Sequence, residues 1–385
     1  MPGRIDSLVL KVAERCNLNC SYCYMYQHAD QSFARRPVFM SDEVFEAVLH
    51  RVVEYCEQHP PGRMWLGLHG GEPTLIGPGR LDRLAQRARV VLGPHLAGFS
   101  MQTNATLIDQ DWITVLRANE IRIGVSLDGP AHMHDMFRVD HSGLGSHSAA
   151  VRGLRLLQTA GLSPGVLCVI NPGASGLLCY RYFRSIEIQR MNFLFPDVTH
   201  ESSRRFYGRY GGTPVADYLI PIFDEWFGQD DPTVRISLFW ELMRRLMGRE
   251  PEGDAFGNPL MSYLVVDTDG TIQALDALKV CEENIAESGL NVLANGFDDL
   301  QFGLPLVHRM VHLGIPLSAE CQRCPERSLC AGGYVPHRYS KAAGFDNPSV
   351  WCKDILRLLA HIRSRVAPFG AAAGYAEIAR AGSSE

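Results

Sequence analysis

The segment ERCNLNCSYC, residues 14–23, determines how the rest of the chain is interpreted. It places Cys16, Cys20 and Cys23 directly after residues 7–12, an apolar run that predicts a buried β-strand. Three thiolates on one short loop can hold three corners of a cubane iron–sulfur cluster. The fourth iron then has no protein ligand, and an open coordination site is typical of a catalytic metal centre. A zinc loop or a set of buried thiols is the alternative.

Short strand-like runs alternate with longer amphipathic runs over the first half of the chain. The pattern predicts strands at residues 7–12, 65–69, 99–102, 121–126, 164–169 and 192–195. It predicts helices at residues 42–58, 80–91, 110–119, 148–160 and 175–188. Such alternation favours parallel strands with right-handed crossovers, in an open sheet or a curled barrel. Functional residues in such sheets lie at the carboxyl ends of the strands.

The composition excludes several classes of protein. The 385 residues are 46% hydrophobic and 21% charged, with a formal net charge of -5. These values exclude a disordered chain and a broadly basic nucleic-acid binder. The chain has no apolar run of membrane-spanning length and no N-terminal signal, so we expect a cytoplasmic protein without a nucleic-acid or membrane partner. Seven of its 11 cysteines fall in two clusters, which indicates metal or redox chemistry rather than disulfides.

The cysteine loop resembles that of the radical S-adenosylmethionine (SAM) superfamily, with the aromatic Tyr22 before the third cysteine. The sequence HGGEP at residues 69–73, after the second predicted strand, resembles a second motif of that superfamily. The resemblance implies a partial (β/α)6 TIM-type barrel and a [4Fe-4S] cluster whose open iron binds SAM. It also implies an external one-electron reductant of the flavodoxin or ferredoxin type. Reductive cleavage of SAM would give methionine and a 5′-deoxyadenosyl radical.

The same resemblance assigns the contacts to SAM. Glu72 would accept from its ammonium group, Arg138 would pair with its carboxylate, and Ile170 would lie near the adenine. Asp128 is either a cofactor contact or a structural turn residue, whereas His69 is expected to be structural or solvent-facing. The complete set of expected cofactor-binding residues is Tyr22, Gly70, Gly71, Glu72, Asn104, Ser126, Arg138 and Ile170.

A second cysteine group lies near the C-terminus. Its members are Cys321, Cys324, Cys330 and Cys352. Four thiolates close a cluster completely, and the arrangement resembles the SPASM domain of radical SAM enzymes that modify peptides. That domain has seven cysteines and two auxiliary clusters, but two of the inner-cluster positions here are Leu275 and Tyr334. We therefore predict one auxiliary [4Fe-4S] cluster, the outer one. Cys281 is isolated, and a structural zinc site is the alternative for the group of four.

The predicted organisation has four parts. Residues 1–198 form the radical SAM core, 199–260 a helical linker, 261–360 the SPASM-like domain and 361–385 a helix end with a flexible tail. Helices are predicted at residues 218–227 and 238–247, and a hairpin at 263–266 and 271–275. The tail from Ala367 onward is rich in Ala, Gly and Ser and is expected to be frayed.

Further segments, spread from about Val9 to Ile355, resemble the FxsB-like radical SAM/SPASM maturases. That resemblance implies a precursor peptide as substrate. It also implies a carbon–carbon crosslink, a cyclophane, between an aromatic side chain and a nearby β-carbon. The reaction needs a base, for which Asp276 is the candidate, although this residue alternatively only closes the hairpin. The competing hypotheses are a sulfatase-maturing-type enzyme, a peptide epimerase and a non-enzymatic iron–sulfur or zinc scaffold.

Two features are expected near the substrate. Asp197, His200 and Glu201 follow the sixth predicted strand, where a substrate would enter. Residues 206–210, together with Arg204, Arg205 and Arg209, either dock a leader peptide or form a solvated helix face.

Overall fold

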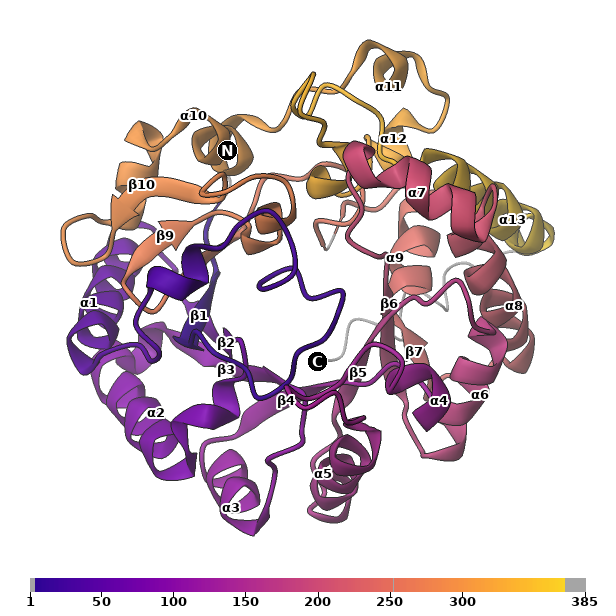
Figure 1. The fold of residues 1–385 in the computed structure, drawn as a ribbon. Helices are drawn as coiled ribbons and strands as arrows, with labels where there is room; N and C mark the ends of the chain where they lie inside the picture. The colour runs from indigo at the N-terminus through magenta and orange to yellow at the C-terminus, as the bar shows by residue number, and fades with distance from the viewer. Residues whose placement is uncertain (1–3, 252, 371–385) are drawn as a thin grey trace.

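A curved sheet of mainly parallel strands lies at the centre of the computed structural model, which describes residues 4–251 and 253–370. Within these residues, ten strands form a single sheet in the order β10-β9-β8-β1-β2-β3-β4-β5-β6-β7. The strands are β1 (Ser7–Ala13), β2 (Met64–Gly70), β3 (Leu96–Thr103), β4 (Ile121–Ser126), β5 (Gly165–Val169), β6 (Arg190–Leu194), β7 (Arg235–Ile236), β8 (Tyr263–Val266), β9 (Thr271–Gln273) and β10 (Glu287–Asn291). The sheet curls into a partial barrel with helices around its outside (Figure 1). The predicted α/β class with parallel strands is confirmed.

The helices α1 to α9 are α1 (Asp42–Gln58), α2 (Pro78–Leu92), α3 (Gln110–Ala118), α4 (Ala131–His134), α5 (His147–Thr159), α6 (Gly176–Ser185), α7 (His200–Tyr210), α8 (Pro214–Gln229) and α9 (Ser237–Leu246). The remaining α-helices are α10 (Pro305–His308), α11 (Ala319–Arg323), α12 (Arg327–Cys330) and α13 (Cys352–Gly370). Helix α1 shows why the sequence pattern predicted it well. Ser41 caps it by accepting from Val44 N at 3.1 Å, and its apolar stripe packs into the core.

Most predicted elements occur with ends shifted by one to three residues. Helix α1 and strand β4 have the predicted ends. The predicted sixth strand, 192–195, runs from Arg190 to Leu194 instead. The expected fraying from Ala367 is wrong for residues 367–370, because α13 continues through Gly370. Buried apolar side chains such as Leu359 and Ile362 anchor this helix against the core, with α8 as a neighbour. The rest of the predicted tail, 371–385, lies outside the described residues.

The predicted hairpin is part of the barrel sheet. Strand β8 pairs in parallel with β1, with Leu8 opposite Leu264, and β9 and β10 continue from β8 in antiparallel pairs. A buried ionic cluster closes this junction, since Arg36 Nη1 lies 3.0 Å from Asp267 Oδ2 and Lys279 Nζ lies 3.4 Å from the same oxygen. The SPASM-like segment therefore begins as an extension of the core sheet. In the ranges 4–251 and 253–370, no helix is both long and apolar enough to cross a bilayer.

Candidate active site

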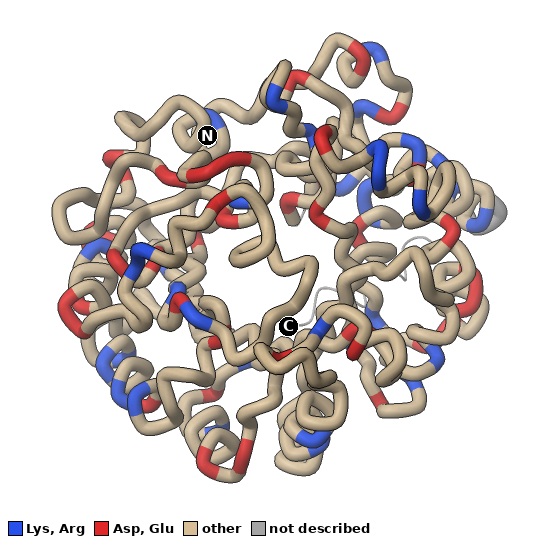
Figure 2. The backbone as a smooth tube through the Cα atoms, viewed as in Figure 1, with Lys and Arg blue, Asp and Glu red and all other residues tan. Residues whose placement is uncertain are grey.

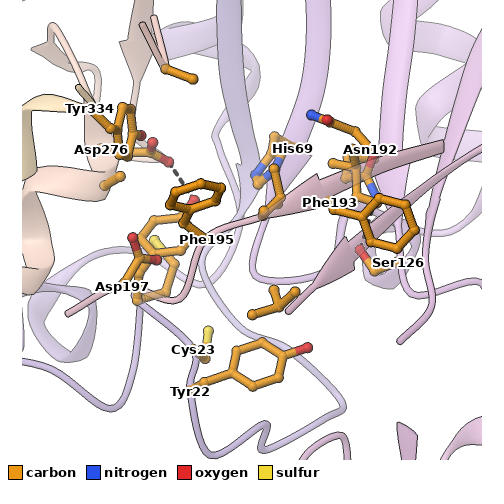
Figure 3. A pocket seen from close by; sticks show the side chains of 18 of the residues that line it. Tyr22, Cys23, His69, Ser126, Asn192, Phe193, Phe195, Asp197, Asp276 and Tyr334 are labelled. Carbon is orange, nitrogen blue, oxygen red and sulfur yellow. Dashed lines mark hydrogen bonds between the residues drawn. The ribbon is translucent and has the colours of Figure 1, made fainter. Parts of the chain in front are cut away.

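A cavity of about 570 Å³ opens at the carboxyl ends of the parallel strands. Its wall includes the first cysteine loop, the ends of β2 to β7, and residues that follow the hairpin. Figure 3 shows part of this wall, with Tyr22 and Cys23 on one side and Asp276 and Tyr334 on another. The cavity thus occupies the place where functional residues of parallel sheets are found.

All three thiols of the first loop line this cavity. Leu18 N donates to Cys16 Sγ at 3.3 Å, and Cys23 N donates to Cys20 O at 3.1 Å. Burial, with smaller effects of the neighbouring thiols, raises the pKa of Cys16 to about 12 and that of Cys23 to about 11. The three groups are therefore close enough to interact electrostatically, and metal binding would have to displace their protons.

These residues fit an iron–sulfur cubane with an open corner. In the described part of the chain, no fourth cysteine lines the cavity beside Cys16, Cys20 and Cys23. Among the same residues, no three Cys, His, Asp or Glu side chains converge as they would on a single metal ion. A cubane requires no such convergence, because each thiolate binds its own corner iron.

Tyr22 joins the loop to the end of β4. Its hydroxyl donates to Asp128 Oδ2 and accepts from Arg138 Nη1 at 2.7 Å. Asp128 also accepts from Val169 N at 3.0 Å through its other oxygen, so its structural interpretation is the one that fits these contacts. Arg138 lines the cavity and its buried Nε has no hydrogen-bond partner within the described residues. That donor is available to an acidic ligand.

Glu72 is buried just after β2, and its carboxyl group stabilises the fold through hydrogen bonds. Its Oε1 accepts from Thr103 Oγ1 at 2.6 Å and from Thr74, and its Oε2 accepts from Asn104 N at 2.8 Å. Burial raises the pKa of Glu72 despite these donors. Glu72 thus ties the ends of β2 and β3 together while its side chain borders the cavity.

Gly70 and Gly71 border the cavity too, but the chain itself requires them. A Cβ on Gly71 would lie 2.4 Å from Arg15 O, and one on Gly70 would lie 2.0 Å from Ala13 O. Both glycines therefore let β2 approach the cysteine loop closely, whereas the sequence suggested only close approach to a ligand.

Of the remaining expected cofactor contacts, Asn104 and Ser126 line the cavity and Ile170 does not. Asn104 lines the cavity but its Nδ2 donates to Asn17 Oδ1 at 2.9 Å, so it holds the cysteine loop. Ser126 also lines the cavity and accepts from Gln102 Nε2 at 2.9 Å. Ile170 is 2% exposed and is absent from the cavity wall, where Val169 lies instead. Ile170 follows the last residue of β5, and its expected place near the adenine stays a prediction.

Asp276 lies in the cavity wall beside a fully buried lysine. It forms an ion pair with Lys11 and accepts from Tyr24 Oη at 2.6 Å. Burial acts against ionisation of this carboxyl, but Lys11, His69 and the hydrogen bonds outweigh burial and lower its pKa below the usual range. Asp276 is therefore a carboxylate at neutral pH. The same ammonium of Lys11 lies 3.3 Å from Nδ1 of His69, which faces the cavity and not the solvent.

Several cavity residues were not singled out from the sequence. They are Gln102, Asn192, Phe193, Trp240, Asp254 and His337, and the buried Lys11 adjoins them through its ion pair with Asp276. A lysine inside an apolar strand was the one available signal, because buried lysines are paired. The others come from segments that meet only in the folded chain.

The second cysteine group also comes together. Burial, with smaller effects of the nearby Cys352, Cys321 and Cys324 thiols, raises the pKa of Cys330 to about 12. Arg338 is fully buried close to Cys321 and Cys330, and its Nη1 lacks a hydrogen-bond partner among the described residues. A buried cation beside four thiols suits an anionic set of thiolates. Leu275 is buried, Tyr334 lines the cavity, and Cys281 Sγ lies 3.7 Å from Pro336 O.

Residues 10–174 match the family model described as "Radical SAM superfamily". Together with the barrel and the three thiols, this match defines the class of the core: residues 10–174 have the radical SAM pattern, and the protein is an enzyme. The scaffold hypothesis is therefore set aside.

The chain is similar to curated sulfatase-maturating enzymes. It is 26% identical over 342 residues to the "Cysteine-type anaerobic sulfatase-maturating enzyme" of Clostridium perfringens, covering 87% of this chain and 90% of that protein. It is 25% identical to the "Serine-type anaerobic sulfatase-maturating enzyme" of Bacteroides thetaiotaomicron, covering 92% and 88%. The solved structure "Native anSMEcpe with bound AdoMet" superposes with a TM-score of 0.80 at 24% identity, covering 94% of this chain and 98% of that chain.

Proposed function

We propose that this enzyme modifies a ribosomally made precursor peptide and forms a carbon–carbon crosslink between an aromatic side chain and a nearby β-carbon. Peptide modification is supported by the similarity to sulfatase-maturating enzymes and by the solved structure "Native anSMEcpe with bound AdoMet and Kp18Cys peptide", which has a TM-score of 0.79. The proposal of a crosslink rests on one observation, the set of side chains that form the cavity wall around Asp276.

This wall combines the carboxyl groups of Asp276, Asp197 and Asp254 with apolar and aromatic side chains. Tyr334 lines it at a position where the SPASM pattern has a cysteine, and Phe193, Phe195 and Trp240 line it as well. Aromatic side chains prefer edge-to-face or offset contacts with other rings, so such a wall can hold an aromatic residue of a peptide in place. In Figure 3, Phe195, Tyr334 and Asp276 gather on one side of the view.

The proposed cofactor sites use the residues described above. Cys16, Cys20 and Cys23 would hold the [4Fe-4S] cluster, and Arg138 Nε would donate to the carboxylate of SAM. When bound, the cluster and SAM supply a radical that removes one hydrogen atom from the substrate. Cys321, Cys324, Cys330 and Cys352 would hold an auxiliary [4Fe-4S] cluster, which supplies one-electron chemistry.

Asp276 is the proposed proton acceptor. Because Lys11 and Tyr24 lower its pKa, it is ionised at neutral pH and ready to accept a proton. It is also a weak base, which suits only a strongly acidic proton. A ring carbon that has gained a bond carries such a proton, and the ring must lose this proton and one electron to restore aromaticity. Asp276 would accept the proton, and the group held by the second cysteine set would accept the electron.

Oxidation of Cys or Ser to an aldehyde is the second candidate, favoured by the identity of 26% to a sulfatase-maturating enzyme over 87% of this chain. Leu275 and Tyr334 count against it, since they stand where the SPASM pattern has cysteines of an inner cluster. A peptide epimerase needs a thiol that returns a hydrogen atom, and Cys281 does not line the cavity.

Coexpression of the gene with short reading frames beside it, followed by mass spectrometry of the peptides, tests the proposal. A crosslink removes two hydrogens, resists fragmentation inside the ring and leaves no group that reacts with a hydrazide. A hydrazide-reactive product would instead establish the aldehyde reaction. An unchanged mass with solvent deuterium at a Cα would establish epimerisation, and either result would refute crosslinking.

A further inference from the structure

Helix α7 presents a basic face to the solvent. Arg204, Arg205 and Arg209 are exposed, and none of the three has an ion pair with another described residue. Several other exposed arginines are paired, as Arg181 is with Glu225 at 2.6 Å, whereas single arginines such as Arg83 and Arg117 also form no ion pair with a described residue. Figure 2 shows the basic residues of α7 grouped at the upper right of the view. Such a group is unexpected in a chain with a net charge of -5, and it creates a locally positive surface.

The single carboxylate on this helix does not neutralise the arginines. Glu201 accepts a hydrogen bond from Lys341 N at 2.7 Å, and this backbone donor helps to lower its pKa even though burial acts in the opposite direction. Lys341 is itself exposed. Glu201 is therefore engaged with the neighbouring segment, while Arg205 and Arg209, four residues apart, share one exposed side of the helix.

The opposite side of α7 fixes the helix at the rim of the cavity. Phe206 lies 5.0 Å from Trp351 between ring centroids, and Tyr207 Oη donates to Val350 O at 2.7 Å. At the other end, a Cβ placed on Gly173, just beyond β5, would lie 3.3 Å from Tyr210. Helix α7 therefore runs from the SPASM-like segment to the end of β5 along the mouth of the barrel.

A row of aromatic rings joins this helix to the cavity. Phe195 lines the cavity and lies 6.1 Å from Trp351, which in turn contacts Phe206. The rings of Phe195 and Phe206 are thus within about 11 Å of each other. An extended peptide spans that distance with about four residues.

We propose that the basic face of α7 binds an acidic segment of the substrate peptide, located about four to eight residues from the residues that react. The inference rests on the proposed function, because it requires a peptide in the cavity. Charge complementarity and continuity with the cavity wall identify the occupant: a chain that leaves the cavity over Phe195 reaches α7. Arginine suits this task because its planar guanidinium binds carboxylates in a bidentate manner.

Binding of synthetic peptides tests the proposal without any turnover. The probes are two fluorescein-labelled 20-residue peptides with the same aromatic core, one with a run of Glu beside the core and one with Gln at the same positions. We expect the Glu peptide to bind the reconstituted enzyme about tenfold more tightly at low salt, and the difference to shrink at about 0.2 M salt. Equal affinities for the two peptides would overturn the proposal.

The combined variant Arg204→Glu, Arg205→Glu and Arg209→Glu should remove the preference for the Glu peptide. The Arg→Gln variant at the same three positions should lower it as well, and circular dichroism checks that both variants fold. The matched control carries Arg83→Glu, Arg117→Glu and Arg309→Glu, which are exposed positions away from α7. An equal loss in the control would overturn the proposal, because net charge would then explain the effect.

The same peptides and variants distinguish two further outcomes. If the α7 variant bound the Glu peptide normally but lost affinity for a flavodoxin, the surface would belong to an electron carrier, and the proposal would be wrong. If the Glu peptide bound as expected and dithionite-driven turnover gave no crosslink, the docking surface would stand and only the proposed reaction would fail.

Discussion

At the residue scale, Lys11 influences the protonation of two side chains that line the cavity. Its ammonium is fully buried and contacts Asp276, Tyr24 Oη at 2.9 Å and His69 Nδ1 at 3.3 Å. The positive charge of Lys11 favours the ionised form of Asp276 and disfavours a proton on His69. Both effects are strong because the groups are buried. The sequence showed this lysine inside an apolar strand, but only the fold shows what it pairs with.

The variant Asp276→Asn tests the proposed base. The amide has nearly the same shape but cannot accept a proton, so we expect crosslinked product to fall about 100-fold or more. Iron content and formation of 5′-deoxyadenosine should stay at the level of the unmodified enzyme. The control is Asp254→Asn, which changes another carboxyl of the same cavity, held by Tyr263 Oη at 2.8 Å. Product at the normal level in Asp276→Asn would refute the base role.

His69 makes stability depend on pH. Burial, followed by the charge of Lys11, lowers its pKa from 6.5 to about 4. The unfolded chain therefore binds a proton between these two values while the folded chain does not. This contribution is fully present above about pH 6.5 and is lost as the pH falls towards 4, for a total of about 3 kcal/mol.

Denaturant unfolding at pH 7 and pH 4.5 measures this contribution. The unmodified protein should lose more stability over that interval than the variant His69→Gln, which has no proton to bind there. Equal losses in the two proteins would show that the imidazole is not held neutral by the fold.

At the element scale, the hairpin β8–β9 is held by the sheet and also by an ion pair to Arg36, in the segment after the cysteine loop. Asp267 is fully buried, and its Oδ2 lies 3.0 Å from Arg36 Nη1 and accepts from Gln273 Nε2 at 2.6 Å. Burial acts against its ionisation, and the adjacent Lys279 and Arg36 favour it. Removing one member of such a cluster leaves buried charges without a partner.

Asp267→Ala should therefore lower the free energy of unfolding by about 3 kcal/mol or more. Asp269→Ala is the matched control in the same turn, because the Asp269 side chain is 34% exposed and its ion pair with Arg36 is longer, at 3.3 Å. We expect less than about 1 kcal/mol for the control. Similar losses in thermal or denaturant unfolding of both variants would contradict this account of the hairpin.

The elements differ in how far the sequence predicted them. Helix α1 has a clear N-terminal cap, and strand β4 has an alternating pattern of buried residues, so the ends of both elements were predicted. Helix α7 was anticipated only as a stretch of residues 206–210, because its mean pattern is polar and its aromatic residues pack on Trp351, far away in the sequence. Ile170 is buried just after β5 and outside the cavity wall, so its expected place near the adenine stays a prediction.

At the scale of the whole molecule, one sheet carries both cysteine-bearing regions. The parallel pairing of β1 with β8 connects the start of the chain to the SPASM-like segment. No local pattern predicts a strand pair between residues so distant, so β1 and β8 fall in different parts of the predicted four-part organisation, which stays a prediction. The class of fold and the cavity at the strand ends were predictable, since parallel sheets place functional residues there.

Iron analysis of reconstituted protein tests the auxiliary cluster. Two [4Fe-4S] clusters give about eight iron atoms per chain, and Cys321→Ala combined with Cys352→Ala should leave about four. Cys281→Ala is the control, because this thiol is buried away from the cavity wall and should not change the count. An unchanged iron content in the double variant would exclude the second cluster, and zinc in its place would establish a structural metal site.

The central claim is that the thiols of Cys16, Cys20 and Cys23 hold the cluster that cleaves SAM. The most direct measurement is 5′-deoxyadenosine formed by anaerobically reconstituted, dithionite-reduced protein supplied with SAM. The account predicts formation of 5′-deoxyadenosine by the unmodified chain and none by the combined variant Cys16→Ala, Cys20→Ala and Cys23→Ala, which should still retain about four iron atoms. Formation by that variant, or none by the unmodified chain, would contradict it.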